Sequence, residues 1–200
     1  MVATKNPGKV REILEICADW PVGWLTFEQV TWPEIEETGT TYLENAVLKA
    51  RGVAESTGHA ALADDSGLEV DALGGAPGPR SARYAGTNAG DEENLRALMR
   101  AVAGVPRPGR TARYRAIAAV AWPNGHHLWT EGECEGLLRT RPSGSGGFGY
   151  DPIFEPIGWE RTMAELPPEE KNRISHRGRA LAALRRILAN RNGNRRTGVE

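Results

Sequence analysis

Long hydrophobic runs are absent from this 200-residue sequence, and none approaches the length needed to span a lipid bilayer. The first residues, MVATKNPGKVREI, also lack the apolar segment of a secretory signal peptide. We therefore expect a cytoplasmic protein that has no membrane partner.

An excess of charge of one sign is missing too. The 25 Lys and Arg residues nearly balance the 26 Asp and Glu residues, which gives a net charge of −1. General nucleic-acid binders carry a basic surface that neutralises phosphates, so no nucleic-acid partner is expected. A local basic site for one small anion is still compatible with this balance, because local charge need not follow net charge.

Cysteine is scarce as well. Cys17 and Cys134 lie far apart and match neither a CxxC motif nor a zinc spacing, which excludes a disulfide scaffold and a cysteine-based zinc site. With 40% hydrophobic residues, a chain of this length can bury a core without disulfides. We expect both thiols to be reduced and buried.

Helical and strand patterns are both present, and together they predict an α/β fold with a mixed sheet. Helices are expected over 8–17, from Thr40 or Thr41 to Val53, from a cap at Asp91 to Val102, and from Ser175 to an end before Gly193. Strands are expected over 24–30, 60–65 and 67–73, with a hairpin formed by 112–122 and 126–140. Residues 191–200 are polar and predict a disordered tail after one domain spanning 1–190.

The segment TKNPGK, residues 4 to 9, turns from a short apolar start into a helix. A helix N-terminus presents backbone N–H groups, and Lys9 adds a full positive charge, so this turn can bind phosphate. Thr4 and Asn6 can add side-chain hydrogen bonds. The alternative from the stretch alone is an ordinary capped turn.

Carboxylates gather in two stretches. EIEETGTTYLENA contains Glu34, Glu36, Glu37 and Glu44, and ADDSG contains the adjacent Asp64 and Asp65, which we expect at the end of a strand. Oxygen ligands suit Mg²⁺ or Mn²⁺, and such an ion would offset the repulsion between neighbouring aspartates. The alternative is a solvated turn.

A glycine-rich loop spans SGSGGFGYDPIF, residues 143 to 154. It formally contains GxGxxG, but no amphipathic helix follows, so a dinucleotide site is rejected. Phe148 and Tyr150 could stack on a base and Asp151 could contact a base edge. The alternative is a flexible loop with core aromatics.

The segment EEKNRISHRGRA, residues 169 to 180, places His176 and Arg177 in the first turn of a helix capped by Ser175. Basic residues there oppose the helix dipole, which favours a nearby anion or acceptor. We therefore take Lys171, His176 and Arg177 as ligand contacts, the alternative being ordinary surface charge.

In this order, the motifs resemble the inosine/xanthosine triphosphate pyrophosphatase family, which acts on non-standard purine nucleoside triphosphates. The matching stretches are TKNPGK, EETGTTYLENAVLKA, ADDSGLEVDALGGAPGPRSARYAG, GGFGYDPIF and EEKNRISHRGRA, and they cover Thr4 to about Leu184. Lys5 and Pro7 fill variable positions of the family pattern.

The resemblance implies two lobes around a long mixed β-sheet with flanking helices and a central nucleotide-binding cleft. It also implies a homodimer and hydrolysis of ITP, dITP or XTP to the monophosphate and pyrophosphate. By resemblance Asp65 is the general base, supported by Asp64, and Asp65 holds Mg²⁺ (or Mn²⁺) with Glu37 or Glu36. The implied substrate contacts are Thr4, Lys5, Asn6, Pro7, Gly8, Lys9, Ser66, Phe148, Gly149, Tyr150, Asp151, Lys171, His176 and Arg177.

Two competing hypotheses remain at this point. One is a nucleotide-binding regulator without hydrolysis, although Asp65 and Lys9, whose loss would favour it, are both present. The other is a related pyrophosphatase that acts on modified pyrimidines or ordinary deoxynucleotides, which the His176-Arg177 and FGYD stretches argue against.

Overall fold

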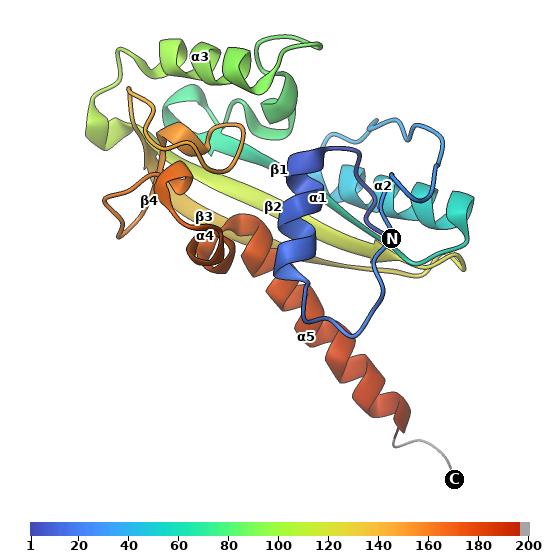
Figure 1. The fold of residues 1–200 in the computed structure, drawn as a ribbon. Helices are drawn as coiled ribbons and strands as arrows, with labels where there is room; N and C mark the ends of the chain where they lie inside the picture. The colour runs from blue at the N-terminus through green and yellow to red at the C-terminus, as the bar shows by residue number, and fades with distance from the viewer. Residues whose placement is uncertain (197–200) are drawn as a thin grey trace. The chain divides into compact units, whose positions relative to one another are not determined.

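The computed structural model describes the backbone of residues 1–196 and the side chains up to residue 191 (Figure 1). Within this part of the chain lie five α-helices and four strands, together with short 3₁₀ turns. The helices are α1 (Pro7–Ile16), α2 (Tyr42–Thr57), α3 (Asp91–Val102), α4 (Pro168–Ile174) and α5 (His176–Arg196). The strands are β1 (Ala61–Val70), β2 (Thr111–Ala121), β3 (His127–Leu138) and β4 (Phe154–Pro156).

The strands form one sheet in the order β1-β2-β3-β4. β3 and β4 pair antiparallel, with Gly136 opposite Pro156 and Leu138 opposite Phe154. At the start of the chain, Val2 forms a parallel bridge with Leu62 of β1. The predicted α/β class is therefore confirmed, and the one parallel pairing described is the isolated bridge of Val2 with Leu62.

The chain divides into two compact units. Unit 1 comprises 1–65, 117–132 and the segment from Arg177 onward, and unit 2 comprises 66–116 and 133–176. β1, β2 and β3 each contribute residues to both units.

Unit 1 has a core of small side chains between α2 and the adjoining strands. Ala46, Ala50 and Val53 recur at helical spacing on α2 and are fully or almost fully buried. They pack with alternate residues of β1 and β2, among them Ala63 and Ala119. Small residues on both elements allow the helix to lie close to the strands that carry the aspartates.

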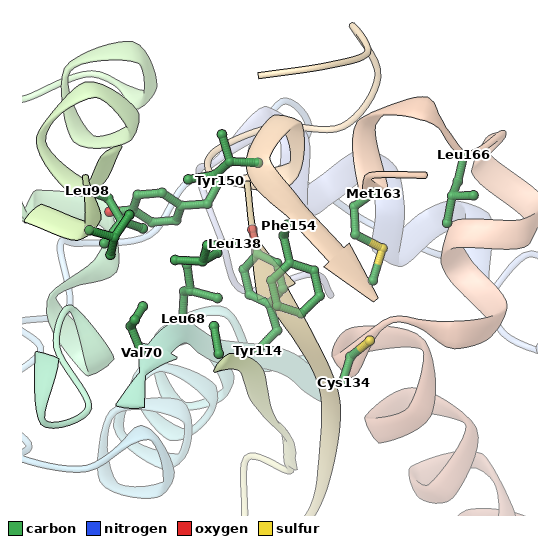
Figure 2. Packing of buried hydrophobic residues seen from close by; sticks show 13 residues of the cluster. Leu68, Val70, Leu98, Tyr114, Cys134, Leu138, Tyr150, Phe154, Met163 and Leu166 are labelled. Atoms are coloured by element: carbon green, nitrogen blue, oxygen red, sulfur yellow. The ribbon is translucent and has the colours of Figure 1, made fainter. Parts of the chain in front are cut away.

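Unit 2 has a core of larger side chains, shown in Figure 2. The aromatic rings of Tyr114 and Phe154 lie 4.6 Å apart between their centroids, and Tyr150 belongs to the same cluster. Gly136 is required here, because a Cβ at this position would lie 2.5 Å from the Phe154 ring. The core thus anchors the strand ends and the loop before β4.

Two expected strand boundaries are wrong. Residues 24–30 form no strand, because the Gln29 side chain accepts hydrogen bonds from both the backbone N–H (2.7 Å) and the hydroxyl (2.8 Å) of Thr26, which closes a local turn. The expected strands 60–65 and 67–73 are instead one continuous strand, β1, which ends at Val70 because Asp71–Leu73 form a 3₁₀ turn. Asp64 and Asp65 therefore lie in the middle of β1 and not at its end.

The helix boundaries need smaller corrections. The N-cap of α3 is Gly90, and Asp91 is the first helical residue. α5 does not end before Gly193 but continues to Arg196, since one glycine costs a helix only about 1 kcal/mol. The rest of the predicted tail, residues 197–200, lies outside the described residues.

Cys17 and Cys134 are both free thiols and both buried, as expected. Burial raises the pKa of the Cys17 thiol to about 12, which keeps it protonated and unreactive. A search of the described residues finds no helix that is long and apolar enough to cross a membrane.

Candidate active site

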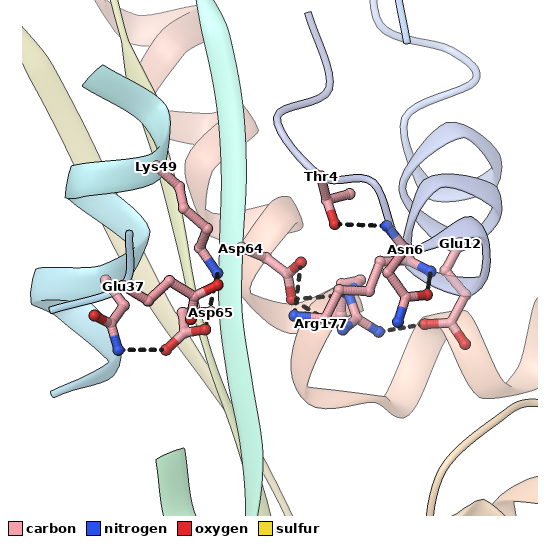
Figure 3. A network of polar contacts seen from close by, with 10 residues as sticks. Thr4, Asn6, Glu12, Glu37, Lys49, Asp64, Asp65 and Arg177 are labelled. Carbon is pink, nitrogen blue, oxygen red and sulfur yellow. Dashed lines mark hydrogen bonds and ion pairs between the residues drawn. The ribbon is translucent and has the colours of Figure 1, made fainter. Parts of the chain in front are cut away.

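The two adjacent aspartates point to opposite faces of β1. Successive side chains alternate across a strand, so neighbouring carboxylates are directed apart, which reduces their mutual repulsion. Figure 3 shows Asp64 turned towards Arg177 and Asp65 turned towards Lys49. Each aspartate is almost fully buried and each has its own cationic partners within unit 1.

The Asp64 face is built around a buried guanidinium. Arg177, at the start of α5, donates to Asp64 Oδ2 through Nε (3.2 Å) and Nη2 (2.9 Å) and to Glu12 of α1 through Nη1. Lys9 Nζ lies 3.3 Å from Asp64 Oδ1. Burial alone would raise the pKa of Asp64, but Arg177 and Lys9 outweigh it and hold that pKa well below its usual range.

The Asp65 face is built on α2. Lys49 Nζ donates to Asp65 Oδ1 at 2.9 Å, and Asn45, one turn earlier on the helix, donates to Asp65 Oδ2 at 3.5 Å. Glu37 Oε1 lies 3.4 Å from the same Lys49 ammonium. Burial raises the pKa of Asp65, and Lys49 limits the rise. Asp65 is thus a carboxylate with increased basicity beside one lysine.

The turn at residues 4–9 leads into α1, as the sequence predicts. Thr4 Oγ1 accepts from the Asn6 backbone N–H (3.2 Å), and Asn6, the N-cap, accepts from the Lys9 backbone N–H (3.1 Å). Pro7 occupies the first helical turn, where its missing N–H is tolerated. Thr4 and Asn6 therefore shape the turn.

The other members of this turn, Lys5, Gly8 and Lys9, are exposed or half-buried. The Lys5 ammonium lies 5.8 Å from the centre of the Trp32 ring, in the segment that leads to Glu37. Gly8 is half-buried in the first turn of α1. Lys9 lies next to Gly8 and is the residue of the turn whose charge reaches Asp64.

The carboxylates around Asp65 fit a hard divalent cation. Glu37 and Asp65 converge on the Lys49 ammonium, so their oxygens face a common point. The described residues contain no group of three or more His, Cys, Asp or Glu side chains arranged for a metal, but Mg²⁺ typically uses one or two carboxylates plus substrate phosphates and water. Glu34, Glu36 and Glu37 are all exposed, but Glu37 alone of the three is linked to Asp65 by a described contact, through Lys49. The structure thus favours Glu37 over Glu36.

The charges of this region also favour a cation with a polyphosphate. Ion pairs around the two aspartates join three cationic and four carboxylate side chains: Lys9, Lys49, Arg177, Glu12, Glu37, Asp64 and Asp65. These seven side chains carry one more negative than positive charge when all are ionised. A triphosphate therefore needs additional positive charge to bind beside them.

The glycine-rich loop of unit 2 closes on a buried ion pair. Lys171 Nζ lies 2.6 Å from Asp151 Oδ2, which also accepts from the Phe148 backbone N–H at 3.0 Å. Gly147 has a positive φ of 70°, and a Cβ there would lie 2.1 Å from the same oxygen. The loop therefore depends on glycine to approach Asp151.

The two aromatic residues of this loop differ. The Tyr150 ring is buried in the unit 2 core, and its hydroxyl donates to the Ser81 carbonyl at 2.7 Å. Phe148 is half-buried, with the Lys171 ammonium 5.3 Å from its ring centre. Gly149 donates its backbone N–H to Asp91 (2.9 Å). The structure therefore favours Phe148, rather than Tyr150, as a ring for stacking on a base.

The remaining substrate candidates are Ser66 and His176. Ser66 follows Asp65 in β1 and is half-buried. His176 is buried, and its imidazole stacks on the Tyr114 ring at 4.5 Å with an interplanar angle of 7°. The structure thus assigns the predicted phosphate and metal residues to unit 1 and the predicted base-contacting loop with His176 to unit 2.

Comparison with known proteins decides the family. The model of the Ham1 family matches residues 1–187. The chain belongs to the Ham1 family. The resemblance to triphosphate pyrophosphatases that the motifs indicate is thereby confirmed.

Related proteins and solved structures of similar proteins align with nearly the full length of this Ham1 chain. A dITP/XTP pyrophosphatase of Desulforamulus reducens is 48% identical over 191 residues, with 94% of each chain covered. One from Geobacter sulfurreducens is 50% identical over 186 residues, which covers 92% of this chain and 94% of the relative. A Ham1 protein from Coxiella burnetii has a TM-score of 0.84 and 42% identity, with 94% of this chain and 97% of that chain covered.

Four residues that contact the site were not singled out from the sequence, and one of them is Asn45, which donates to Asp65. Lys49 and Glu12 pair with predicted site residues, and Tyr114 contacts His176. The spacing of Asn45 and Lys49 on one face of a predicted helix is a signal that could have suggested Lys49. No comparable local signal marks Glu12 or Tyr114, whose partners are distant in the sequence.

Proposed function

We propose that this Ham1 protein hydrolyses non-standard purine nucleoside triphosphates, namely dITP, XTP and ITP, to the monophosphate and pyrophosphate. The names of its relatives support this activity, since they are dITP/XTP pyrophosphatases of similar length. The observation that carries the proposal is the buried Asp65 carboxylate beside Lys49 and Glu37. This group combines a base with carboxylates that could hold the divalent cation needed beside a polyphosphate.

Asp65 acts as the general base. The oxygen of a water molecule attacks a phosphorus atom of the triphosphate, and a proton of this water passes to an Asp65 carboxylate oxygen. The bond between the nucleoside monophosphate part and the pyrophosphate leaving group breaks. A raised pKa makes Asp65 a better proton acceptor near neutral pH than an exposed aspartate. Lys49 and Asn45 hold the carboxylate in one orientation.

Basic groups of unit 1 bind the phosphates. Lys9 and Arg177 compensate Asp64 in the free protein and can turn part of their hydrogen-bonding capacity to phosphate oxygens. Asp65 and Glu37 would hold Mg²⁺, or Mn²⁺ in its place, which supplies charge neutralisation for the leaving pyrophosphate. The ion pairs around the two aspartates contain four carboxylates but only three cationic side chains, and this excess of negative charge supports the assignment of a metal ion.

Selectivity against adenine follows from hydrogen-bond donors in unit 2, whereas guanine shares the 6-keto group and differs from hypoxanthine in its 2-amino group. Hypoxanthine and xanthine carry a 6-keto acceptor, which suits the N–H groups of Lys171 and His176. Adenine carries a 6-amino donor and would leave such donors unpaired, which can reduce reactivity by about 10⁴-fold. Phe148 provides a ring on which the purine can stack.

Assembly and location complete the proposal. We infer a homodimer, on the family resemblance, and sedimentation equilibrium would test it. We infer a cytoplasmic location because the substrates belong to the nucleotide pool and both cysteines are free thiols. Fractionation with detection of the endogenous protein would test the second point.

The function itself is tested with a substrate panel. ITP, XTP, dITP, ATP, GTP and dUTP are incubated separately with Mg²⁺ and with chelator, and pyrophosphate and orthophosphate are measured. Metal-dependent release of pyrophosphate from ITP, XTP and dITP, with little from ATP and GTP, is the expected result. Release of orthophosphate would show that a different bond is cleaved. Absence of any release would favour the nucleotide-binding regulator.

A further inference from the structure

Tyr114 is a buried tyrosine of β2 that contacts two predicted base-recognition residues at once. Its hydroxyl donates to Asp151 Oδ1 at 3.2 Å. The face of its ring stacks on the His176 imidazole at 4.5 Å, with the two planes only 7° apart. The side chain is 7% exposed, so it can touch substrate only through these partners.

The contact with Asp151 holds the second oxygen of that carboxylate. Lys171 and the Phe148 backbone N–H bind Oδ2, whereas Tyr114 binds Oδ1. A buried carboxylate held on both oxygens keeps a fixed orientation, and its ion pair in turn directs the Lys171 ammonium. The Tyr114 hydroxyl therefore influences Lys171 through Asp151.

The contact with His176 fixes a second donor. A parallel stack at 4.5 Å restricts rotation of the imidazole, and the Phe154 ring packs against Tyr114 at 4.6 Å (Figure 2). His176 is also the first residue of α5, so the stack restrains its side chain at the beginning of that helix. Tyr114 thus connects the orientation of the histidine to that of the carboxylate.

We propose that Tyr114 is a positioning residue for purine selectivity, which aligns His176 and the Asp151–Lys171 pair to face a 6-keto purine. This inference rests on the proposed function. Its two contacts are separable, because phenylalanine keeps the ring and loses the hydroxyl, whereas leucine loses both.

The test measures KM, kcat and the ratio of kcat/KM for ITP to that for ATP in Tyr114→Phe and Tyr114→Leu. Tyr114→Phe should raise KM for ITP about threefold to tenfold through loss of one hydrogen bond, with kcat within about twofold. Tyr114→Leu should raise KM for ITP about tenfold to a hundredfold. It should also lower the ratio of kcat/KM for ITP to that for ATP more than Tyr114→Phe does. Phenylalanine therefore partly rescues the leucine defect.

A matched control and a binding measurement make the result decisive. Tyr84→Phe removes a phenol hydroxyl from a ring packed against the same core, and it should leave KM and selectivity unchanged. Calorimetric binding of IMP reports recognition without turnover. If wild type binds IMP and hydrolyses ITP but both Tyr114 variants match it in KM and selectivity, the inference is wrong. A proportional loss of activity on all purines, with unchanged KM, would show a purely structural role. If wild type neither hydrolyses ITP nor binds IMP, the proposed function fails as well.

Discussion

Replacement of Arg177 by methionine tests the energetics of the charged cluster in unit 1. The Arg177 side chain is 2% exposed and pairs with Asp64 and Glu12, which are themselves buried. Its loss leaves two buried carboxylates without this partner, and the break of a buried ion pair costs about 3–5 kcal/mol. For a chain of this length, each kcal/mol lowers Tm by roughly 2–4 °C, so we expect a decrease of about 6–20 °C at pH 7.

The pH dependence identifies the cause of the loss. In the wild type, the lowered pKa of Asp64 stabilises the folded state at pH values above 3.8, which is the ordinary pKa of an aspartate. This contribution is lost as the pH falls through the pKa that Asp64 has in the folded protein. Without Arg177 the pKa of Asp64 rises, so the variant takes up its proton at higher pH. The difference in unfolding free energy should therefore shrink on acidification, by at most about 1.4 kcal/mol per pH unit for each proton.

The assay is urea unfolding of both proteins at several pH values. The matched control is Arg185→Met on the same helix, whose pair with Asp19 is exposed and should contribute about 0–1 kcal/mol. Addition of Asp64→Asn to Arg177→Met should recover part of the lost stability. A loss at pH 7 no larger than that of Arg185→Met would refute the reasoning.

Three further predictions concern activity. Asp65→Asn should lower kcat by about 10³-fold or more while the thermal transition is kept, and near-normal pyrophosphate release would remove Asp65 from its role as base. Lys49→Met should move the acid limb of the kcat/KM profile to higher pH, because burial raises the pKa of Asp65 and Lys49 limits the rise; an unmoved limb would contradict this. Lys9→Ala should raise KM for ITP about tenfold through loss of a charged phosphate contact, and an unchanged KM would argue against that contact.

The sequence identifies much of the architecture through local signals. The apolar spacing predicts a helix that starts at Thr40 or Thr41, and Thr41 is its N-cap, with both hydrogen bonds of a capping box to Glu44 formed. The alternation along 112–122 and 126–140 with a Pro-Asn-Gly turn between them predicts β2 and β3. These features depend on neighbours a few residues apart, so they are visible in the sequence.

The parts that were missed depend on distant partners. Ser66-Gly67 reads locally as a break after Asp65, yet β1 continues through it, because its place in the sheet outweighs the weak local signal. The ion pair of Asp64 with Arg177 joins residues 113 positions apart in the chain, and only the fold brings them together. The same holds for the stack between Tyr114 and His176, whose residue types predict no contact.

Because the two aspartates of β1 point to opposite faces, their surroundings depend on whether the strand gains or loses an odd or an even number of residues. Deletion or insertion of one residue between Ala61 and Asp64, with the strand ends held in register, would rotate every following side chain to the other face. After an insertion Asp64 would occupy the position that faces Lys49, and after a deletion Asp65 would occupy the position that faces Arg177, so in each case one aspartate would enter the surroundings of the other. A change of two residues would restore the directions. This strand should therefore tolerate paired length changes better than single ones, whatever the chemistry of the residue involved.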